Sequence, residues 1–158
     1  MRIAHTIHLS LEIPKKFECS ILSGCREKAM NLFTYGTLTF PEVWKRLDVG
    51  EFPSQVATLP GFAIYRVKVA VFPGIVRASP DERVTGLLYQ NLDEDVLVEL
   101  DAYESDLYDR IPVIVATERG PIDCTAYVIA DSHREALTNE VWDAKAFEEH
   151  QLAKYLQG

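Results

Sequence analysis

From Met30 onward the chain is a series of short β-type segments separated by turn residues, with a few helical patterns between them. We predict strands at residues 32–35, 56–59, 62–71, 85–91, 108–117 and 122–130, and helices at 40–47, 93–103 and 144–156. In the turn predicted at 72–75, Pro73 fixes φ and Gly74 is free to take a positive φ. This pattern indicates an α+β domain whose sheet can curl toward a barrel.

The length of 158 residues and the hydrophobic content of 47% fit one domain with a full core. Residues 1–29 lack clean periodicity, and regular patterning begins at Met30. We therefore predict a poorly ordered, ancillary N-terminal extension over 1–29 and a single domain over 30–158. The extension has polar interruptions where a secretory signal needs a continuous apolar core, so we expect a cytoplasmic protein.

Charge is unevenly distributed along the chain. Residues 1–29 hold five of the 16 Lys and Arg and three of the 24 Asp and Glu, so residues 30–158 carry a formal net charge of −10. An acidic domain repels phosphate backbones and anionic lipid headgroups, which argues against nucleic acid and membrane surfaces as partners. An anionic substrate would have to be held by local backbone dipoles or by one placed cation. The three cysteines, Cys19, Cys25 and Cys124, form no C-x-x-C pair and have no neighbouring histidines, so we predict reduced thiols and no metal site.

The predicted helix at 93–103 leads into Glu104. At about 100° per residue, Leu97, Leu100 and Glu104 lie within one narrow arc, so the carboxyl shares the face that the leucines bury. The helix macrodipole also disfavours a negative charge at this end. Both effects raise the pKa of a carboxyl toward the range useful for general acid–base catalysis. A solvated glutamate at a frayed helix end is the alternative.

A second candidate element follows the first predicted strand, at Tyr35, Gly36, Thr37 and Leu38. It lacks the second glycine and the Lys-Ser/Thr pair of a phosphate-binding loop. A strand that ends in a glycine and a polar residue can point consecutive backbone N–H groups into a cleft, which suits a substrate carboxylate or a developing oxyanion. An ordinary glycine turn is the alternative.

Tyr108 and Arg110 come just after Glu104, in the strand predicted at 108–117. Several aspartates lie close to Arg110 in the sequence, so this residue either forms a solvent-exposed ion pair or contacts substrate. Tyr108 is either a half-buried strand aromatic or a catalytic phenol.

Four motifs occur in order: Tyr35-Gly36-Thr37-Leu38, Gly86-Leu87-Leu88-Tyr89, Leu100-Asp101-Ala102-Tyr103-Glu104 and Tyr108-Asp109-Arg110-Ile111-Pro112-Val113-Ile114-Val115. With the tail Trp142-Asp143-Ala144-Lys145-Ala146-Phe147, His150 and Tyr155-Leu156, this set resembles the gamma-glutamylcyclotransferase family, including its avirulence-induced-gene-type members. The family pattern is Y-G-x-L, G-x-L-Y, L-D-x-x-E-G and Y-x-R-x-x-V-x-V, and the resemblance covers nearly all of 30–158. One departure is Ser105, which stands where a glycine often follows the glutamate and would change the turn that aims Glu104.

The resemblance implies a small mixed β-barrel with flanking helices and an enzyme that needs no cofactor or metal. It implies that the α-amine of a small γ-glutamyl amide attacks the γ-carbonyl of the same molecule, giving 5-oxoproline and releasing an amine or amino acid. The matching residues would be Glu104 as proton acceptor and donor, Tyr35, Gly36, Thr37 and Leu38 as the loop that holds the glutamyl part, and Tyr108 and Arg110 as further substrate contacts.

Two alternatives stay open. The fold could be kept as a small-molecule binding module with little turnover, which a displaced Glu104 would favour. The domain could instead act on a carrier-linked or antibiotic-type γ-glutamyl amide, which a wide, shallow mouth would favour. The sequence does not name the leaving amine, since glutathione, γ-glutamyl amino acids and γ-glutamylamines all satisfy the glutamyl half. It does not determine the oligomeric state either, with a monomer slightly favoured.

Overall fold

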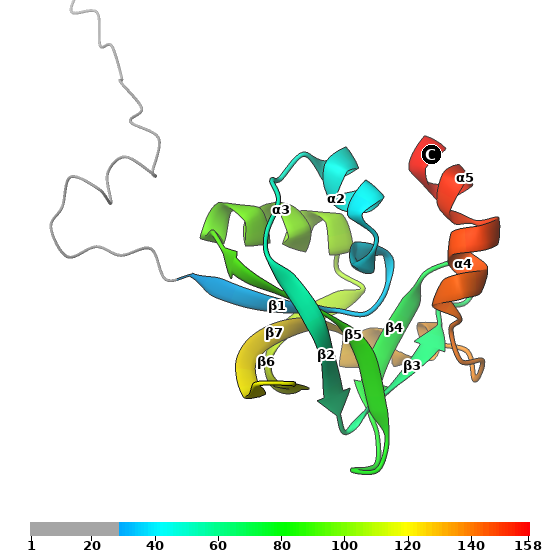
Figure 1. The fold of residues 1–158 in the computed structure, drawn as a ribbon. Coiled ribbons are helices and arrows are strands. Elements are labelled where there is room, and N and C mark those ends of the chain that lie inside the picture. The colour runs from blue at the N-terminus through cyan, green and yellow to red at the C-terminus, as the bar shows by residue number, and fades with distance from the viewer. Residues whose placement is uncertain (1–28) are drawn as a thin grey trace, which may run out of the picture.

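The computed structural model describes residues 29–158, so the extension predicted for 1–29 lies outside the described residues except for its last one. Within this range, five strands form a closed barrel in the order β1–β5–β2–β6–β7 (Figure 1). Their bounds are β1 Met30–Thr34, β2 Ser54–Pro60, β5 Arg83–Leu92, β6 Tyr108–Thr117 and β7 Gly120–Ile129. Strands β1 and β7 run parallel, and the other neighbours run antiparallel. The barrel is therefore mixed, and the predicted fold class is confirmed.

A two-stranded sheet accompanies the barrel, with β3 (Phe62–Arg66) antiparallel to β4 (Pro73–Arg77). Two predictions are wrong here. The strand predicted for 62–71 ends at Arg66, and the turn predicted at 72–75 is the start of β4. Gly74 is not among the glycines with positive φ. A Cβ at Gly74 would lie 2.3 Å from Cγ1 of Ile129, so this glycine lets β4 pack closely against β7. Pro73 is tolerated because it begins a strand at the edge of a small sheet.

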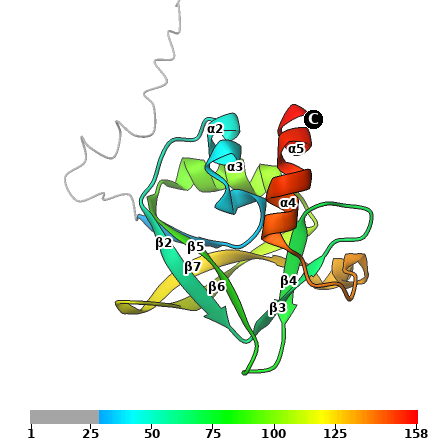
Figure 2. The same ribbon diagram turned by 45° about the vertical axis from the view of Figure 1, so that its right-hand side comes forward.

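The α-helices gather on one side of the barrel, as both ribbon views show (Figures 1 and 2), whereas the 3₁₀ helix that follows β7 lies beside β3 and β4. The bounds of the α-helices and 3₁₀ helices are η1 Thr37–Thr39, α2 Pro41–Leu47, α3 Glu94–Glu104, η2 Asp131–Ala136, α4 Ala144–His150 and α5 Leu152–Gln157. The single helix predicted at 144–156 is thus two helices, separated at Gln151, whose φ and ψ are −125° and −27°. No helix in the part of the chain that the structure describes is both long and apolar enough to cross a membrane.

Two hydrophobic cores share the wall of the barrel. One fills the barrel interior, around Phe33 and Leu88, and the other lies between the barrel and the helices, around Leu32 and Leu100. Leu32 and Phe33 are neighbours on β1, and their side chains enter different cores because successive side chains of a strand point to opposite faces. Both side chains are fully buried. Strand β1 is therefore held from both sides, and its end, where the candidate loop begins, has a fixed position.

Gly86 explains how the end of β1 approaches β5 so closely. A Cβ at Gly86 would lie 2.0 Å from the carbonyl oxygen of Thr34, so no other residue fits without moving the backbone. The Thr34 hydroxyl is buried and donates to the carbonyl of Leu87 at 3.1 Å. This contact fixes the point at which the chain leaves the barrel and enters the loop at 35–38.

Candidate active site

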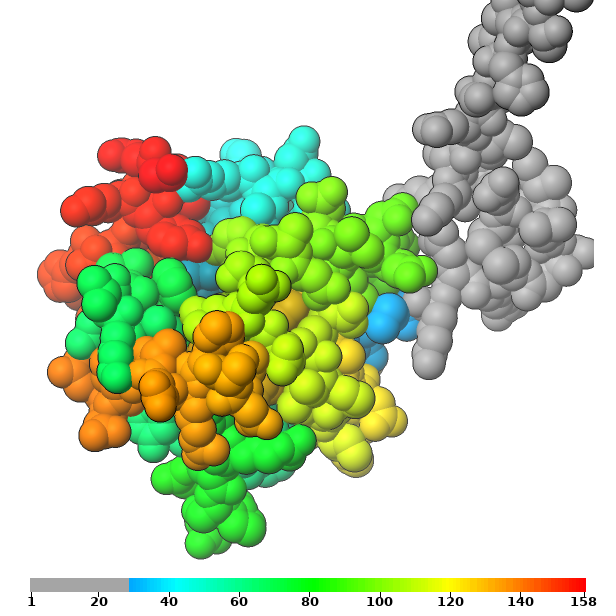
Figure 3. Space-filling view, turned by 180° about the vertical axis from the view of Figure 1, so that it is seen from behind, coloured from blue at the N-terminus to red at the C-terminus, as the bar shows by residue number. Residues whose placement is uncertain are grey.

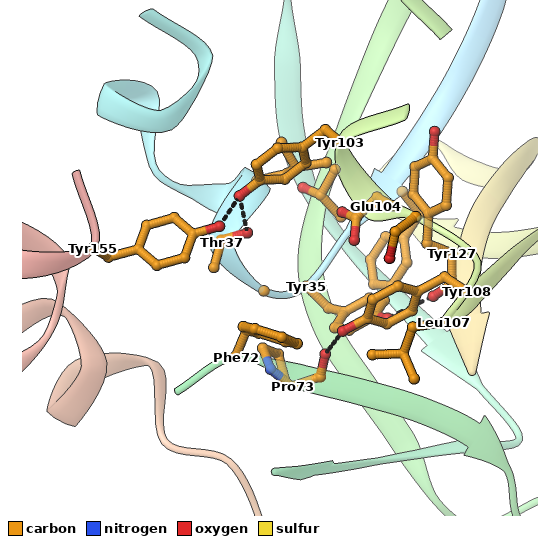
Figure 4. A pocket seen from close by; sticks show the side chains of 15 residues that line it. Tyr35, Thr37, Phe72, Pro73, Tyr103, Glu104, Leu107, Tyr108, Tyr127 and Tyr155 are labelled. Carbon is orange, nitrogen blue, oxygen red and sulfur yellow. Dashed lines mark hydrogen bonds between the residues drawn. The ribbon is translucent and has the colours of Figure 1, made fainter. Parts of the chain in front are cut away.

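A pocket of about 100 Å³ lies where the end of β1, the end of α3, the start of β4 and the last helix meet (Figure 4). Its lining residues are Phe33, Thr34, Tyr35, Gly36, Thr37, Leu38, Phe72, Pro73, Tyr103, Glu104, Ser105, Leu107, Tyr108, Tyr127 and Tyr155. The volume is well below the roughly 300–1,000 Å³ of sites for drug-sized ligands, so the pocket suits one small, compact group. The two elements that the sequence singled out, Glu104 and the loop at 35–38, both line it.

Glu104 is the last residue of α3, and its carboxyl group points into this pocket (Figure 4). Leu97 and Leu100, on the same arc of the helix, are 1% and 0% exposed, which places the carboxyl at the edge of the buried face. Burial raises the pKa of Glu104 from 4.5 to about 8, because the ionised form loses its hydration. At neutral pH this carboxyl can both accept and donate a proton, as a general acid–base catalyst must.

The turn after Glu104 is strained. Ser105 has φ 63° and ψ −173°, a conformation found almost only for glycine, and its N–H donates to the carbonyl of Asp101 at 3.1 Å. A residue with a Cβ in this region costs roughly 1–3 kcal/mol. The serine therefore occupies the backbone conformation that suits the glycine expected here, and Glu104 remains directed into the pocket.

The loop at 35–38 closes the opposite wall of the pocket. Tyr35 is buried, and its hydroxyl donates to the carbonyl of Tyr127 at 2.5 Å. A Cβ at Gly36 would lie 2.8 Å from Cγ of Pro73, so the lack of a side chain at Gly36 lets the start of β4 pack closely against the loop. The following 3₁₀ turn is closed by bonds from Thr39 N to Gly36 O (3.0 Å) and from Phe40 N to Thr37 O (3.2 Å). Within this turn, the N–H groups of Thr37 and Leu38 have no role in these bonds, as expected for the first positions of a helical turn.

Five tyrosines line the pocket together with Glu104: Tyr35, Tyr103, Tyr108, Tyr127 and Tyr155. Burial is the main reason why the pKa values of the first four lie above the ordinary phenol value, and the negative charge of Glu104 contributes to each rise. The phenols of Tyr35, Tyr103, Tyr108 and Tyr127 therefore remain neutral at physiological pH. The sequence reasoning missed Tyr127 and Tyr155 as pocket residues, and also Tyr103, although it is adjacent to Glu104.

Tyr108 lies in the pocket wall, where its hydroxyl donates to the carbonyl of Pro73 at 2.6 Å. Arg110, expected to contact substrate, is not among the residues that line this pocket. Its Nε lies 2.8 Å from Asp101 Oδ1 and its Nη2 lies 3.2 Å from Asp101 Oδ2, in a bidentate pair. The Tyr127 hydroxyl donates to the same carboxylate at 2.7 Å. Arg110 therefore forms an ion pair. Its contact with substrate stays a prediction, because Arg110 also lines a neighbouring concavity, together with Asp101, Tyr108 and Tyr127.

The Asp101 carboxylate is ionised and accepts three hydrogen bonds, two from Arg110 and one from Tyr127. Burial alone would raise its pKa, but hydrogen bonds from Arg110 and Tyr127 outweigh this effect and lower it. Asp101 and Arg110 therefore form a pair of compensating charges next to the pocket.

The pocket itself holds one ionisable carboxyl and no basic group, since none of its described lining residues is Lys, Arg or His. Within residues 29–158, no group of three or more His, Cys, Asp or Glu side chains is arranged to hold a metal ion. Any anionic part of a ligand in this pocket has to be bound by hydroxyl groups and backbone N–H groups. Proton transfer at Glu104 is the chemistry that these side chains offer.

Sequence comparison with known proteins gives a family match and a similar curated protein. The family model described as gamma-glutamyl cyclotransferase, AIG2-like, matches residues 32–144. AIG2-like protein C of Arabidopsis thaliana is 33% identical over 135 residues, which cover 82% of this chain and 74% of that protein.

Solved structures agree on the fold. The solution structure of an Arabidopsis thaliana protein superposes with a TM-score of 0.62 at 26% identity, covering 82% of this chain and 87% of the other. The crystal structure of an AIG2-like protein from Mus musculus superposes with a TM-score of 0.54 at 23% identity, covering 73% and 88%. The second similarity, at this low identity, bears on the fold alone.

Proposed function

The chain belongs to the gamma-glutamyl cyclotransferase, AIG2-like family, and from this premise we propose that it cyclises a small γ-glutamyl amide to 5-oxoproline and releases an amine or amino acid. The observation that carries the proposal is the position of Glu104. A carboxyl with a pKa of about 8 lies in a small pocket, opposite a loop whose first N–H groups are not used by its own turn. Proton transfer next to a polarised carbonyl is what this pair can perform.

The chemical steps are an intramolecular aminolysis. The substrate's α-nitrogen attacks its γ-carbonyl carbon, a ring C–N bond forms, and the amide C–N bond to the leaving group breaks. Two protons leave the attacking nitrogen and two reach the leaving nitrogen, so a single carboxyl that accepts and then donates can serve both. Because the nucleophile belongs to the substrate, effective molarity is already high once the chain is folded into a near-attack pose.

Each part of the site has a place in this proposal. Glu104 carries the protons, and the loop at 35–38 holds the glutamyl part, its N–H groups binding a carboxylate or the oxyanion. A second concavity of about 610 Å³ adjoins the pocket and shares Ser105, Tyr108 and Tyr127 with it. The small pocket suits the glutamyl unit, and this adjoining space accommodates the leaving group. None of these steps requires a metal or an organic cofactor.

The proposal is tested by incubating the full chain with glutathione, γ-glutamyl amino acids and γ-glutamylamines, and by quantifying 5-oxoproline. We expect one of these classes to give turnover that is lost in Glu104→Gln. Glu99→Gln is the matched control, because Glu99 lies on the same helix but is exposed and outside the pocket. A wild-type protein that forms no 5-oxoproline from any class, yet binds 5-oxoproline, would be a binding module and would contradict the proposal.

A further inference from the structure

Three hydroxyl groups from distant parts of the chain meet at one wall of the pocket (Figure 4). The Tyr103 hydroxyl, at the end of α3, lies 3.0 Å from Oγ1 of Thr37 in η1, and it is also hydrogen-bonded to the hydroxyl of Tyr155 in α5. Tyr103 is 66 residues from Thr37 and 52 residues from Tyr155 in the sequence. All three residues line the pocket that holds Glu104.

We propose that the hydroxyl groups of Thr37, Tyr103 and Tyr155 form a subsite for the free carboxylate of the substrate, which makes Tyr155 a substrate-binding residue. This inference rests on the proposed function and deepens it, because it specifies a ligand with a carboxylate next to its reacting amine. We call the three residues the hydroxyl cluster.

A count of protons shows why this cluster can bind an anion. Three hydroxyls carry three protons, and the two hydrogen bonds within the cluster use two of them. The third proton is available to an acceptor in the pocket. The other buried hydroxyls of the pocket donate to fixed protein acceptors, namely Thr34 to Leu87 O, Tyr35 to Tyr127 O, Tyr108 to Pro73 O and Tyr127 to Asp101. Ser105 lies at the exposed rim.

The absence of a basic side chain among the described residues of the pocket lining also indicates that neutral hydroxyl groups bind the carboxylate. No described residue lining the pocket is basic, and Arg110 is paired with Asp101 outside it. A carboxylate that enters must therefore be held by neutral donors. Burial raises the pKa of Tyr103, so its hydroxyl keeps its proton. In a chain of hydrogen-bonded hydroxyls each bond polarises the next, which strengthens the hydrogen bond from the last hydroxyl to the carboxylate.

Tyr155 is held in place rather than free to rotate away. Its backbone carbonyl accepts a hydrogen bond from Nη1 of Arg46 in α2 at 2.8 Å. Its ring packs edge-on against Phe147 of α4, with centroids 5.7 Å apart. In the space-filling view from behind, the red C-terminal helices lie beside cyan α2 and green α3 (Figure 3). The last helix thus supplies a fixed wall of the site.

The N–H groups of the loop at 35–38 could bind either the substrate carboxylate or the oxyanion, and the hydroxyl cluster decides between these two roles. With the carboxylate bound by hydroxyls, the N–H groups of Thr37 and Leu38 can serve the γ-carbonyl oxygen, where negative charge develops. Glu104 lines the same pocket, where it would meet the α-amine that the substrate carries next to its carboxylate.

The test compares 5-oxoproline with 2-pyrrolidinone, the same ring without the carboxylate, by ligand-detected NMR titration of the full chain. In Tyr155→Phe we expect 5-oxoproline to bind about tenfold more weakly, and in the double variant Tyr103→Phe/Tyr155→Phe about a hundredfold more weakly. Each substitution removes a hydroxyl that either contacts the carboxylate or polarises the hydroxyl that does, and these losses are in the range for hydrogen bonds to a charged acceptor. Binding of 2-pyrrolidinone should change less than about twofold. Tyr65→Phe, a half-buried tyrosine outside the pocket, is the matched control.

Equal losses for both ligands would show that the tyrosines only shape the pocket, and unchanged 5-oxoproline binding would show that the carboxylate lies elsewhere. A wild-type protein that does not prefer 5-oxoproline to 2-pyrrolidinone would also overturn the inference. Turnover is measured separately. If the binding pattern appears without turnover, the proposed function fails and the carboxylate subsite stands. If turnover appears without this binding pattern, the carboxylate subsite fails and the proposed function stands.

Discussion

The two sides of Glu104 are built from opposite kinds of chemistry. On one side, Asp101, Arg110 and Tyr127 form a charged network whose Arg110 and Asp101 side chains are 25% and 42% exposed. On the other side, the hydroxyl cluster is neutral and faces the pocket. The charges of the network compensate each other, whereas the cluster keeps one proton for a ligand. The pairing of charges outside the pocket leaves its interior without a fixed cation.

This difference explains how the pKa of Glu104 reaches about 8. Desolvation is the cause of the rise. An unpaired guanidinium nearby would favour the ionised carboxylate and oppose that rise. Because Asp101 compensates Arg110, the charged side can fix the end of α3 without taking the proton away from Glu104.

Removing the titrating group between the two sides should have the largest effect. If Glu104 carries the protons, Glu104→Gln keeps the pocket shape but lowers turnover by about 10²–10⁴-fold, the usual contribution of general acid–base catalysis. The measurement is the initial rate of 5-oxoproline formation on the best substrate of the panel. Glu99→Gln should stay within about twofold of wild type. A Gln variant with near-normal turnover would falsify the assignment of Glu104.

The same substitution should stabilise the protein, and more strongly at high pH. The folded pKa of Glu104 is about 8 and its ordinary value is 4.5, so ionisation of this carboxyl costs stability progressively as pH rises from about 4.5 through 8. Below that window both folded and unfolded forms are protonated and the cost vanishes. We expect Glu104→Gln to match wild type near pH 4 and to exceed it by roughly 2–4 kcal/mol near pH 9.

Thermal denaturation across this pH range measures the difference, with Glu99→Gln as the control. A difference that does not depend on pH would mean that the Glu104 carboxyl is not desolvated.

Breaking the charged side should move the pH dependence of catalysis. Asp101→Asn leaves Arg110 without its compensating charge, so the pKa of Glu104 should fall and the rising limb of kcat/KM should shift to lower pH. The free energy of unfolding should fall by only about 1 kcal/mol, because the pair is partly exposed. The pH–rate profile of one substrate, compared with wild type, is the measurement.

The double variant Asp101→Asn/Arg110→Gln is the control for charge, because it removes both partners. In this double variant the rising limb of the kcat/KM profile should return toward the pH at which it lies in the wild type. A limb that stays in place in both variants would show that Asp101 only supports the helix end.

The turn where the two sides meet should give the smallest effect. Ser105 occupies a conformation that suits glycine, so Ser105→Gly relieves roughly 1–3 kcal/mol of strain but adds about 0.5–1 kcal/mol of unfolded-state entropy. The net gain of about 1 kcal/mol corresponds to a Tm increase of about 2–4 °C for a chain of this size. Turnover should change little, since the direction of Glu104 is retained. A lower Tm would mean that the Ser105 side chain makes a stabilising contact.

Local patterns predicted much of the fold and the first elements of the candidate site. The arc of Leu97, Leu100 and Glu104 follows from helix geometry, and the structure places the two leucines in the core and the carboxyl at its edge. The hairpin predicted for 108–117 and 122–130 forms as β6 and β7. Prediction failed where residues serve distant contacts. Gly74 suggested a turn, but its missing Cβ makes room for Ile129, which is remote in the sequence.

The sequence by itself determined the α+β class, the family resemblance, and the pairing of a carboxyl at a helix end with a glycine loop after a strand. These features are local, because periodicity and turn chemistry depend on neighbouring residues. Only the tertiary structure decided that Arg110 pairs with Asp101 and that Tyr127 and Tyr155 reach the pocket. Those contacts exist because the barrel closes and the last helix packs beside α2, so that hydroxyls from residues 37, 103 and 155 meet. Closure is a property of the whole chain, and no window of the sequence contains it.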